Sequence, residues 1–309
     1  NNLIDMIKNF GKIINIDNLY DDYKIENKNP IYELKNHLSY VYCLCLLNDG
    51  RLVSGSGDNS IIIYNKTTFQ PDLVIKEHSN SISFIIQLSS GELVSCSYDK
   101  LIKLYKIKGM QYEVLQILNY HKDIVNKMIE LKNKKLVSCS YDSSIIFYSK
   151  NNKKYEKDYL ITTKGCCSSI IQTKDNEICY SENNKSSICF YDISKGKIIE
   201  TISNISKRNS NVDKLIMIKK DLLLIPGENQ LSIININEYK LVRIIDVPNS
   251  SFITGVSLLN ENMLITGDFK MIIRQWKIEG DNLILISKKE QTHNDRVYVL
   301  LNMGNGLIR

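Results

Sequence analysis

The four histidines of this chain fall on one sequence period, and this regularity constrains the fold more than any other feature. His37, His78, His121 and His293 are separated by 41, 43 and 172 residues, and the last separation spans four periods of 43. Catalytic or metal-binding histidines need no regular spacing, whereas a structural position that is copied in every repeat does. A period of this length indicates a repeat protein.

The segments that follow the first three histidines share one pattern. They read HLSYVYCLCLLNDGRLVSGSGDNSIIIYN (37–65), HSNSISFIIQLSSGELVSCSYDKLIKLYK (78–106) and HKDIVNKMIELKNKKLVSCSYDSSIIFYS (121–149). Each contains an alternating apolar run, a polar turn, an LVSxSxD motif and a second apolar run. Short runs of period two between polar turns predict β-strands. Three strands after each histidine, and a fourth before the next, match one blade of a β-propeller.

Later parts of the chain keep the strand–turn–strand pattern without the histidine. These parts are 177–192, 221–237 and 262–277, and they predict blades four, five and six. A seventh blade begins at His293, but only two strands fit before the chain ends. We therefore expect Lys12–Asp17 and Pro30–Lys35 to supply its third and fourth strands, so that both termini share the last blade. The chain then divides into an extension over 1–29, which contributes one strand, and a propeller over 30–309.

The repeat resembles that of the WD-repeat family over roughly residues 30–309. The family motif places His before the first strand, Ser or Thr in the second, Asp in the next turn and Trp in the third. The resemblance implies that these side chains form a hydrogen-bond network within each blade. The matching residues are His37, Ser54, Asp58 and Tyr64 in blade one, His78, Ser95, Asp99 and Tyr105 in blade two, and His121, Ser138, Asp142 and Tyr148 in blade three. Tyrosine replaces the usual tryptophan, which survives only as Trp276 in blade six. The expected fold is all-β, a seven-bladed β-propeller of four-stranded antiparallel blades.

No residue pattern indicates catalysis, and we expect no catalytic, cofactor or metal site. The glycines of Gly55–Asp58 lie between two expected strands, where they cannot bind a phosphate at a helix N-terminus. HExxH and nucleophile-elbow motifs are missing from the sequence. The cysteines of the expected strands, Cys43, Cys45, Cys96 and Cys139, form no CxxC pair and are expected to be reduced and buried. Adjacent Cys166 and Cys167 leave a redox or metal role open.

Composition narrows the partner classes. The net charge of +6 comes from scattered lysines such as those of 132–135 and 150–154, which favours solvated loops over a nucleic-acid site. A run of about 18 apolar residues, as a membrane-spanning helix needs, does not occur. The first residues show no basic stretch followed by an apolar run, so we do not expect this segment to be secreted. We therefore expect a cytoplasmic or nuclear protein that does not bind membranes.

The WD-repeat resemblance also implies a binding face, the narrower face of the ring. Its residues flank the start of each innermost strand and precede the turn aspartate. The larger residues at these positions are Tyr40, Tyr42, Tyr98, Tyr141, Phe252, Arg296 and Tyr298, and the smaller or charged ones are Ser81, Ser83, Ile124, Asn126 and Asp213. Tyrosine and arginine are enriched in binding hot spots. The expected function is a non-catalytic scaffold that binds a peptide or protein there. The alternatives are a ubiquitin-binding or substrate-recognition module of a larger protein, and nucleic-acid binding through the lysine-rich loops.

Overall fold

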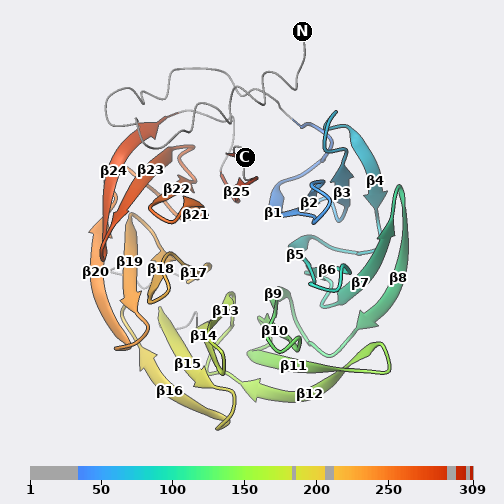
Figure 1. Cartoon of the computed structure of the whole chain (residues 1–309), viewed down its shortest axis with the longest axis horizontal. Helices are drawn as coiled ribbons and strands as arrows, with labels where there is room; N and C mark the ends of the chain where they lie inside the picture. The colour runs from blue at the N-terminus through green and yellow to red at the C-terminus, as the bar shows by residue number, and fades with distance from the viewer. Residues whose placement is uncertain (1–33, 183–185, 206–211, 291–296, 304–306, 309) are drawn as a thin grey trace.

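A computed structural model describes residues 34–182, 186–205, 212–290, 297–303 and 307–308. These residues form β-strands, turns and loops, without an α-helix among them. The strands are grouped into sheets that follow one another around a ring, and the innermost strand of each sheet faces the centre (Figure 1). The all-β propeller architecture predicted from the repeat is thus confirmed.

The first three blades have the same order of four antiparallel strands from the centre outward. Blade 1 consists of β1 (Val41–Leu46), β2 (Leu52–Ser56), β3 (Ile61–Tyr64) and β4 (Pro71–Ile75). Blade 2 consists of β5 (Ile82–Gln87), β6 (Leu93–Ser97), β7 (Ile102–Lys108) and β8 (Gln111–Leu118). Blade 3 consists of β9 (Val125–Glu130), β10 (Leu136–Ser140), β11 (Ser144–Asn151) and β12 (Lys154–Thr162).

The next three blades, which lack the histidine, repeat this order. Blade 4 consists of β13 (Ile170–Lys174), β14 (Glu177–Glu182), β15 (Ser187–Asp192) and β16 (Lys197–Ile202). Blade 5 consists of β17 (Ile216–Met217), β18 (Leu222–Pro226), β19 (Gln230–Asn235) and β20 (Lys240–Asp246). Blade 6 consists of β21 (Ile253–Asn260), β22 (Met263–Asp268), β23 (Ile273–Glu279) and β24 (Asn282–Lys289).

Position within a blade explains the burial of each strand. The second strands β2, β6 and β10 are buried at every residue, because neighbouring blades cover both of their faces. The outermost strand β8 instead alternates between exposed and half-buried residues up to Leu118, which is buried. The cores lie between blades: Val94 and Leu104 of blade 2, for example, belong to one cluster with Val125 and Met128 of blade 3.

A short sheet lies between the inner ends of blade 6 and blade 1 (Figure 1). It pairs β25 (Leu301–Asn302) with β26 (Leu307–Ile308). The segment before it packs on blade 6, because Val297 and Leu300 join Ile265 and Ile273 in one apolar cluster. On the other side, Leu301 and Met303 pack against the cluster of Leu52, Ile62 and Tyr64 in blade 1.

The prediction of seven four-stranded blades was wrong for the residues that the structure describes. They form six such blades and the two-stranded sheet β25–β26. Most of the residues expected to complete a seventh blade lie outside the described ranges. Lys12–Asp17 and most of Pro30–Lys35 lie outside the described residues, and Leu34 and Lys35, which are described, are not in a strand. It therefore stays a prediction that both termini share the last blade and that residues 1–29 form an extension.

Candidate functional site

Blades 1, 2 and 3 each contain the same chain of side-chain hydrogen bonds. In blade 2, His78 Nδ1 lies 2.7 Å from Asp99 Oδ2, and His78 Nε2 lies 2.6 Å from Ser95 Oγ. Ser95 Oγ also lies 3.3 Å from the hydroxyl of Tyr105. The same three distances are 2.9, 2.6 and 3.4 Å in blade 1 (His37, Asp58, Ser54, Tyr64), and 3.0, 2.7 and 3.0 Å in blade 3 (His121, Asp142, Ser138, Tyr148). The structure therefore brings together the four repeat positions in each of these blades.

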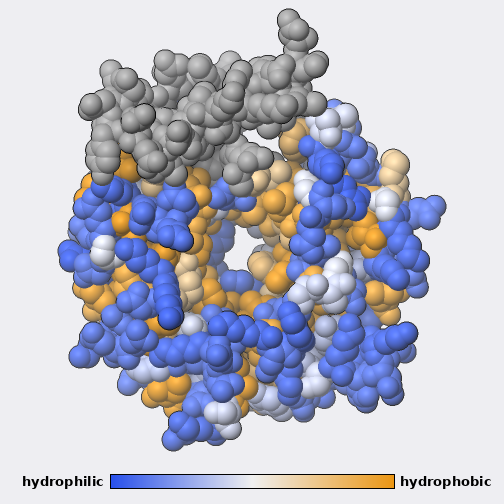
Figure 2. All heavy atoms as spheres, viewed as in Figure 1, coloured by the Kyte–Doolittle hydropathy of each residue, from blue (hydrophilic) through white to orange (hydrophobic). Residues whose placement is uncertain are grey.

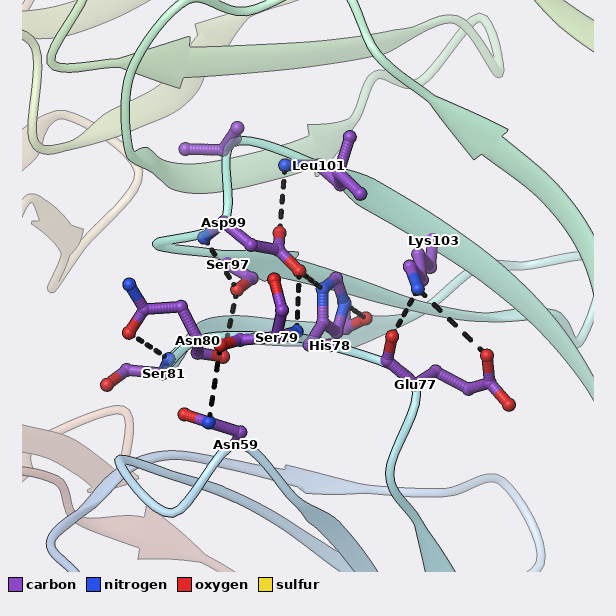
Figure 3. A network of polar contacts seen from close by, with 12 residues as sticks. Asn59, Glu77, His78, Ser79, Asn80, Ser81, Ser97, Asp99, Leu101 and Lys103 are labelled. Carbon is purple, nitrogen blue, oxygen red and sulfur yellow. Dashed lines mark hydrogen bonds and ion pairs between the residues drawn. The ribbon is translucent and has the colours of Figure 1, made fainter.

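The aspartate of the network also fixes the turn between the second and third strands. Asp99 accepts hydrogen bonds from the backbone N–H groups of Ser79 and Leu101 (Figure 3). In the same view, Asn59 of the blade 1 turn donates to the carbonyl of Ser79, which links the two neighbouring blades. Asp99 thus ties the turn of blade 2 to the loop before β5, and blade 1 holds the same loop through Asn59.

Hydrogen bonds to these carboxylates dominate their titration. Burial alone would raise the pKa of Asp58, but hydrogen bonds from Ser60, from the Leu38 N–H and from His37 outweigh it and lower the pKa to about 2. In Asp142 burial is likewise outweighed, chiefly by His121 and Ser144, and its pKa falls well below the usual range. Both groups are therefore carboxylates at neutral pH, as their role as acceptors requires.

One backbone hydrogen bond recurs on the face of the ring where the innermost strands begin. The donor is the N–H of the residue before the turn aspartate, or of the residue at the same position in blade 6. The acceptor is the carbonyl of the residue just before the innermost strand. The four cases are Gly57 N–H to Tyr40 O (2.8 Å), Tyr98 N–H to Ser81 O (2.9 Å), Tyr141 N–H to Ile124 O (2.9 Å) and Phe269 N–H to Phe252 O (3.1 Å). Both sets of positions expected to bind partners are thus held next to each other.

Aromatic rings from four parts of the chain meet on this face. Tyr42 stacks on Tyr98, with ring centroids 6.2 Å apart and planes 8° apart, and it meets Tyr298 edge-on at 5.3 Å. Tyr298 also lies 5.2 Å from Tyr40 and 5.2 Å from Phe269, and Phe269 lies 5.9 Å from Phe252. We refer to these six residues together with Tyr141 as the tyrosine face.

Tyr141 extends the tyrosine face onto blade 3. Burial raises the pKa of its phenol to about 12, and the nearby carboxylate of Asp213 and the phenol of Tyr98 add to that shift. Burial also raises the pKa of Tyr98, with contributions from Tyr42 and Asp213. The hydroxyls of Tyr98 and Tyr141 are therefore neutral at physiological pH and can act as hydrogen-bond donors and acceptors.

A glycine makes the packing of the rings possible. Gly57 holds the position that Tyr98 and Tyr141 hold in their blades. A Cβ atom on Gly57 would lie 2.8 Å from Ser39 Oγ and 3.2 Å from the Tyr42 ring. The space that a side chain would take in blade 1 is occupied instead by Tyr42, which comes from the innermost strand β1.

Phe269 was not predicted from the sequence as a binding residue. The prediction for Arg296 is not tested by the structure. Phe269 precedes Lys270, because the aspartate of blade 6, Asp268, stands two positions earlier than in blades 1 to 3. Aligning Leu264–Asp268 with the LVSGS segment of blade 1 would have revealed it. Arg296, like the histidine His293, lies outside the described residues.

Blade 6 builds a different polar network at the same place. Arg274 and Asp268 form an ion pair of 2.6 Å whose side chains are 3% and 0% exposed. Ser250 Oγ donates to the same carboxylate at 2.9 Å. Trp276 Nε1 donates to Thr266 Oγ1 at 2.9 Å, in place of the serine–tyrosine contact of the earlier blades.

The cysteines and loop lysines resemble ordinary structural residues. Cys43, Cys96 and Cys139 are buried and free, whereas Cys45 is only half-buried, contrary to expectation. Cys167 is buried and Cys166 is half-buried. Across the described ranges, no group of three or more His, Cys, Asp or Glu residues could hold a metal ion. The same residues contain no helix long and apolar enough to cross a membrane.

Comparison with known families identifies the repeat. The family model described as "WD domain, G-beta repeat" matches residues 28–65 and 69–106, which cover blade 1 and most of blade 2. Four-stranded antiparallel blades continue the same architecture through blade 6. The chain contains WD repeats and folds as a β-propeller. No curated protein matches its sequence. Propellers of the WD-repeat family are in general non-catalytic scaffolds for protein interactions.

Proposed function

We propose that this WD-repeat propeller is a scaffold that binds a protein or peptide on the tyrosine face. The observation that carries the proposal is the continuous contact between the six aromatic rings. Tyr40 and Phe252 are 44% and 40% exposed, so the cluster offers apolar surface and hydroxyl groups to a partner. Tyrosine is favoured in binding hot spots because it contributes large area at a small cost in conformational entropy.

The turns that carry these rings are held in place before any partner arrives. Tyr98 and Tyr141 each precede a network aspartate whose N–H donates to the serine on the other side of the tyrosine, Ser97 or Ser140. The N–H groups of both tyrosines donate to the residue just before the innermost strand. A surface held in this way has less conformational entropy to lose on binding. This supports recognition of a partner by a preformed site.

The loop lysines support a protein partner over a nucleic acid. Several are already paired with carboxylates: Lys132 with Asp175 at 2.6 Å, Lys135 with Asp158 at 2.6 Å and Lys150 with Glu92 at 3.1 Å. Phosphate contacts would have to displace these acids. If nucleic acid were nevertheless the ligand, binding would weaken steeply with added salt, whereas an aromatic site would change little.

Comparative capture tests the proposal. The wild-type chain and a Tyr40→Ala/Tyr98→Ala/Phe269→Ala variant are immobilised, and the captured proteins are quantified by mass spectrometry. The matched control is Ile117→Ala/Leu285→Ala, which removes exposed apolar residues from the outer strands β8 and β24. We expect the triple variant to lose partners that the control retains. If both variants retain the same partners as the wild type, the tyrosine face is not the binding site.

Ubiquitin is the defined partner to try first. Titrating labelled ubiquitin with the wild-type chain gives chemical-shift changes if ubiquitin binds the tyrosine face, and the triple variant removes these changes. No shift with the wild-type chain removes ubiquitin from the candidates and leaves the capture experiment to identify the partner.

A further inference from the structure

Two lysines occupy the centre of the ring, where a protein seldom places unpaired charges. Lys127 lies on the innermost strand β9, and Lys214 lies just before the innermost strand β17. Lys127 directly follows Asn126, and Lys214 directly follows Asp213. Asn126 and Asp213 are two of the residues expected on the narrower binding face of the ring. Figure 2 shows that the ring has an opening at its centre. Both lysines are half-buried.

The two ammonium groups are held differently. Lys214 Nζ reaches from blade 5 to the segment before β25 and donates to the carbonyl of Tyr298 at 3.1 Å. Lys127 Nζ lies 5.7 Å from the centre of the Phe84 ring in blade 2. Among the described residues, Lys127 Nζ has no hydrogen-bond acceptor and no carboxylate partner. A half-buried ammonium normally has one or the other.

Electrostatics shows that the two charges act on each other. Burial and the positive charge of Lys127, against the opposite effect of Asp213, together lower the pKa of Lys214 to about 8. Burial also lowers the pKa of Lys127. Asp213 is exposed to solvent, yet protein surrounds it closely enough for burial to raise its pKa. One carboxylate therefore compensates two ammonium groups incompletely.

We infer that the centre of the ring binds a compact oxyanion, a phosphate or carboxylate group, between Lys127 and Lys214. Such a group would supply the missing acceptor for Lys127 and offset the repulsion between the two lysines. It enters past the rings of the tyrosine face, so it is either a free ion or an acidic side chain of a bound partner. Both sources present the same chemistry to the lysines.

Binding of inorganic ions tests the inference without any protein partner. Calorimetric titration at constant ionic strength is done with phosphate on the wild type, Lys127→Met, Lys214→Met and Lys132→Met. Lys132 is an exposed loop lysine, so its substitution is the matched control. We expect each central substitution to weaken binding about tenfold or more and the control to leave it unchanged. Circular dichroism verifies that each variant is folded.

The pH dependence adds a second readout. Sulfate is the probe here, because its charge is constant over the range. Its affinity should fall as the pH rises through about 8, where Lys214 loses its proton. Lys214→Met should lose this pH dependence. Phosphate binding that is undetectable in the wild type, or equal in wild type and a Lys127→Met/Lys214→Met variant, would overturn the inference.

Peptides distinguish the two sources of the anion. A short phosphoserine peptide that binds more tightly than inorganic phosphate, and loses this gain in Tyr98→Ala, identifies a side chain of a partner. Equal affinity for peptide and ion identifies a free anion. Either result supports the oxyanion site, and failure of this site leaves the capture experiment on the tyrosine face unaffected.

Discussion

Blade 2 and blade 5 are the same four-stranded sheet stabilised in two ways. In blade 2, the second strand contributes Ser95, which links His78 to Tyr105 by hydrogen bonds. In blade 5, the equivalent position is Leu224, fully buried and paired with Ile233 of the next strand. A satisfied polar network and an apolar contact both fill the space between neighbouring blades, so either can support the sheet.

The two kinds of blade differ in what they present to solvent. An aspartate network is present in blades 1, 2, 3 and 6, and each of these blades contributes rings to the tyrosine face. Blade 1 contributes Tyr40 and Tyr42 from the start of its innermost strand, and blades 2, 3 and 6 contribute Tyr98, Tyr141 and Phe269 in or beside the turn. None of the seven residues of the tyrosine face comes from blade 4 or blade 5. We conclude that an aspartate network occurs in the blades that contribute to the tyrosine face, whereas the described parts of blades 4 and 5 are stabilised without one.

Removing a network aspartate should have the largest effect. Asp142 accepts hydrogen bonds from His121, from Lys122 N–H, and from Ser144 through both its N–H and its hydroxyl. Asp142→Ala leaves these donors buried without an acceptor, so we expect a loss of about 4 kcal/mol in the free energy of unfolding. Urea denaturation measures it. A loss below about 1 kcal/mol would show that the network is dispensable.

Truncating the apolar equivalent should cost somewhat less and leave binding intact. Leu224→Ala creates a cavity between blades 5 and 6, and we expect a loss of about 3 kcal/mol. The folded fraction of this variant should bind tyrosine-face partners as the wild type does. Folded Asp142→Ala should bind them more weakly, because the turn with Tyr141 is no longer fixed. If the folded fractions of both variants bound partners equally well, the aspartate network would not be needed to hold the binding face.

These contrasts also explain what the sequence could predict. The three histidine-marked blades followed from LVSxSxD, because that motif fixes both the strand and the turn. Arg274 and Asp268 could not be recognised as a network, because a buried arginine has no distinctive pattern before the fold places it. Phe269 was missed because the shifted aspartate hid its register. The prediction of seven blades depended on strands expected in parts of the chain that the structure does not describe.

Ring closure provides a smaller test. A Cβ atom on Gly267 would lie 2.5 Å from Val297 Cγ1, so blade 6 and the segment before β25 can meet only because this residue is glycine. We expect Gly267→Ala to reduce the free energy of unfolding by about 2 kcal/mol. Adding Val297→Ala should recover part of the loss in thermal unfolding. No recovery would mean that the clash lies elsewhere.

Acid should reduce the difference between the two kinds of blade. The pKa of Asp58 is about 2 in the folded chain, against about 3.9 in an unfolded one. Its stabilising effect is therefore complete above pH ~4 and is lost as the pH falls through about 2. The stability gap between wild type and Asp58→Asn should shrink over that range, while the gap to Leu224→Ala stays constant. Melting temperatures measured against pH decide this.

The most direct measurement is photo-crosslinking from single positions of the propeller. A benzophenone amino acid replaces Tyr98 in one chain and Ile117, an exposed residue of the outer strand β8, in another. We expect the chain with the benzophenone at position 98 to form a protein adduct that the chain with the benzophenone at position 117 does not form. Equal adducts from both positions, or an adduct from 117 alone, would contradict a binding surface on the tyrosine face.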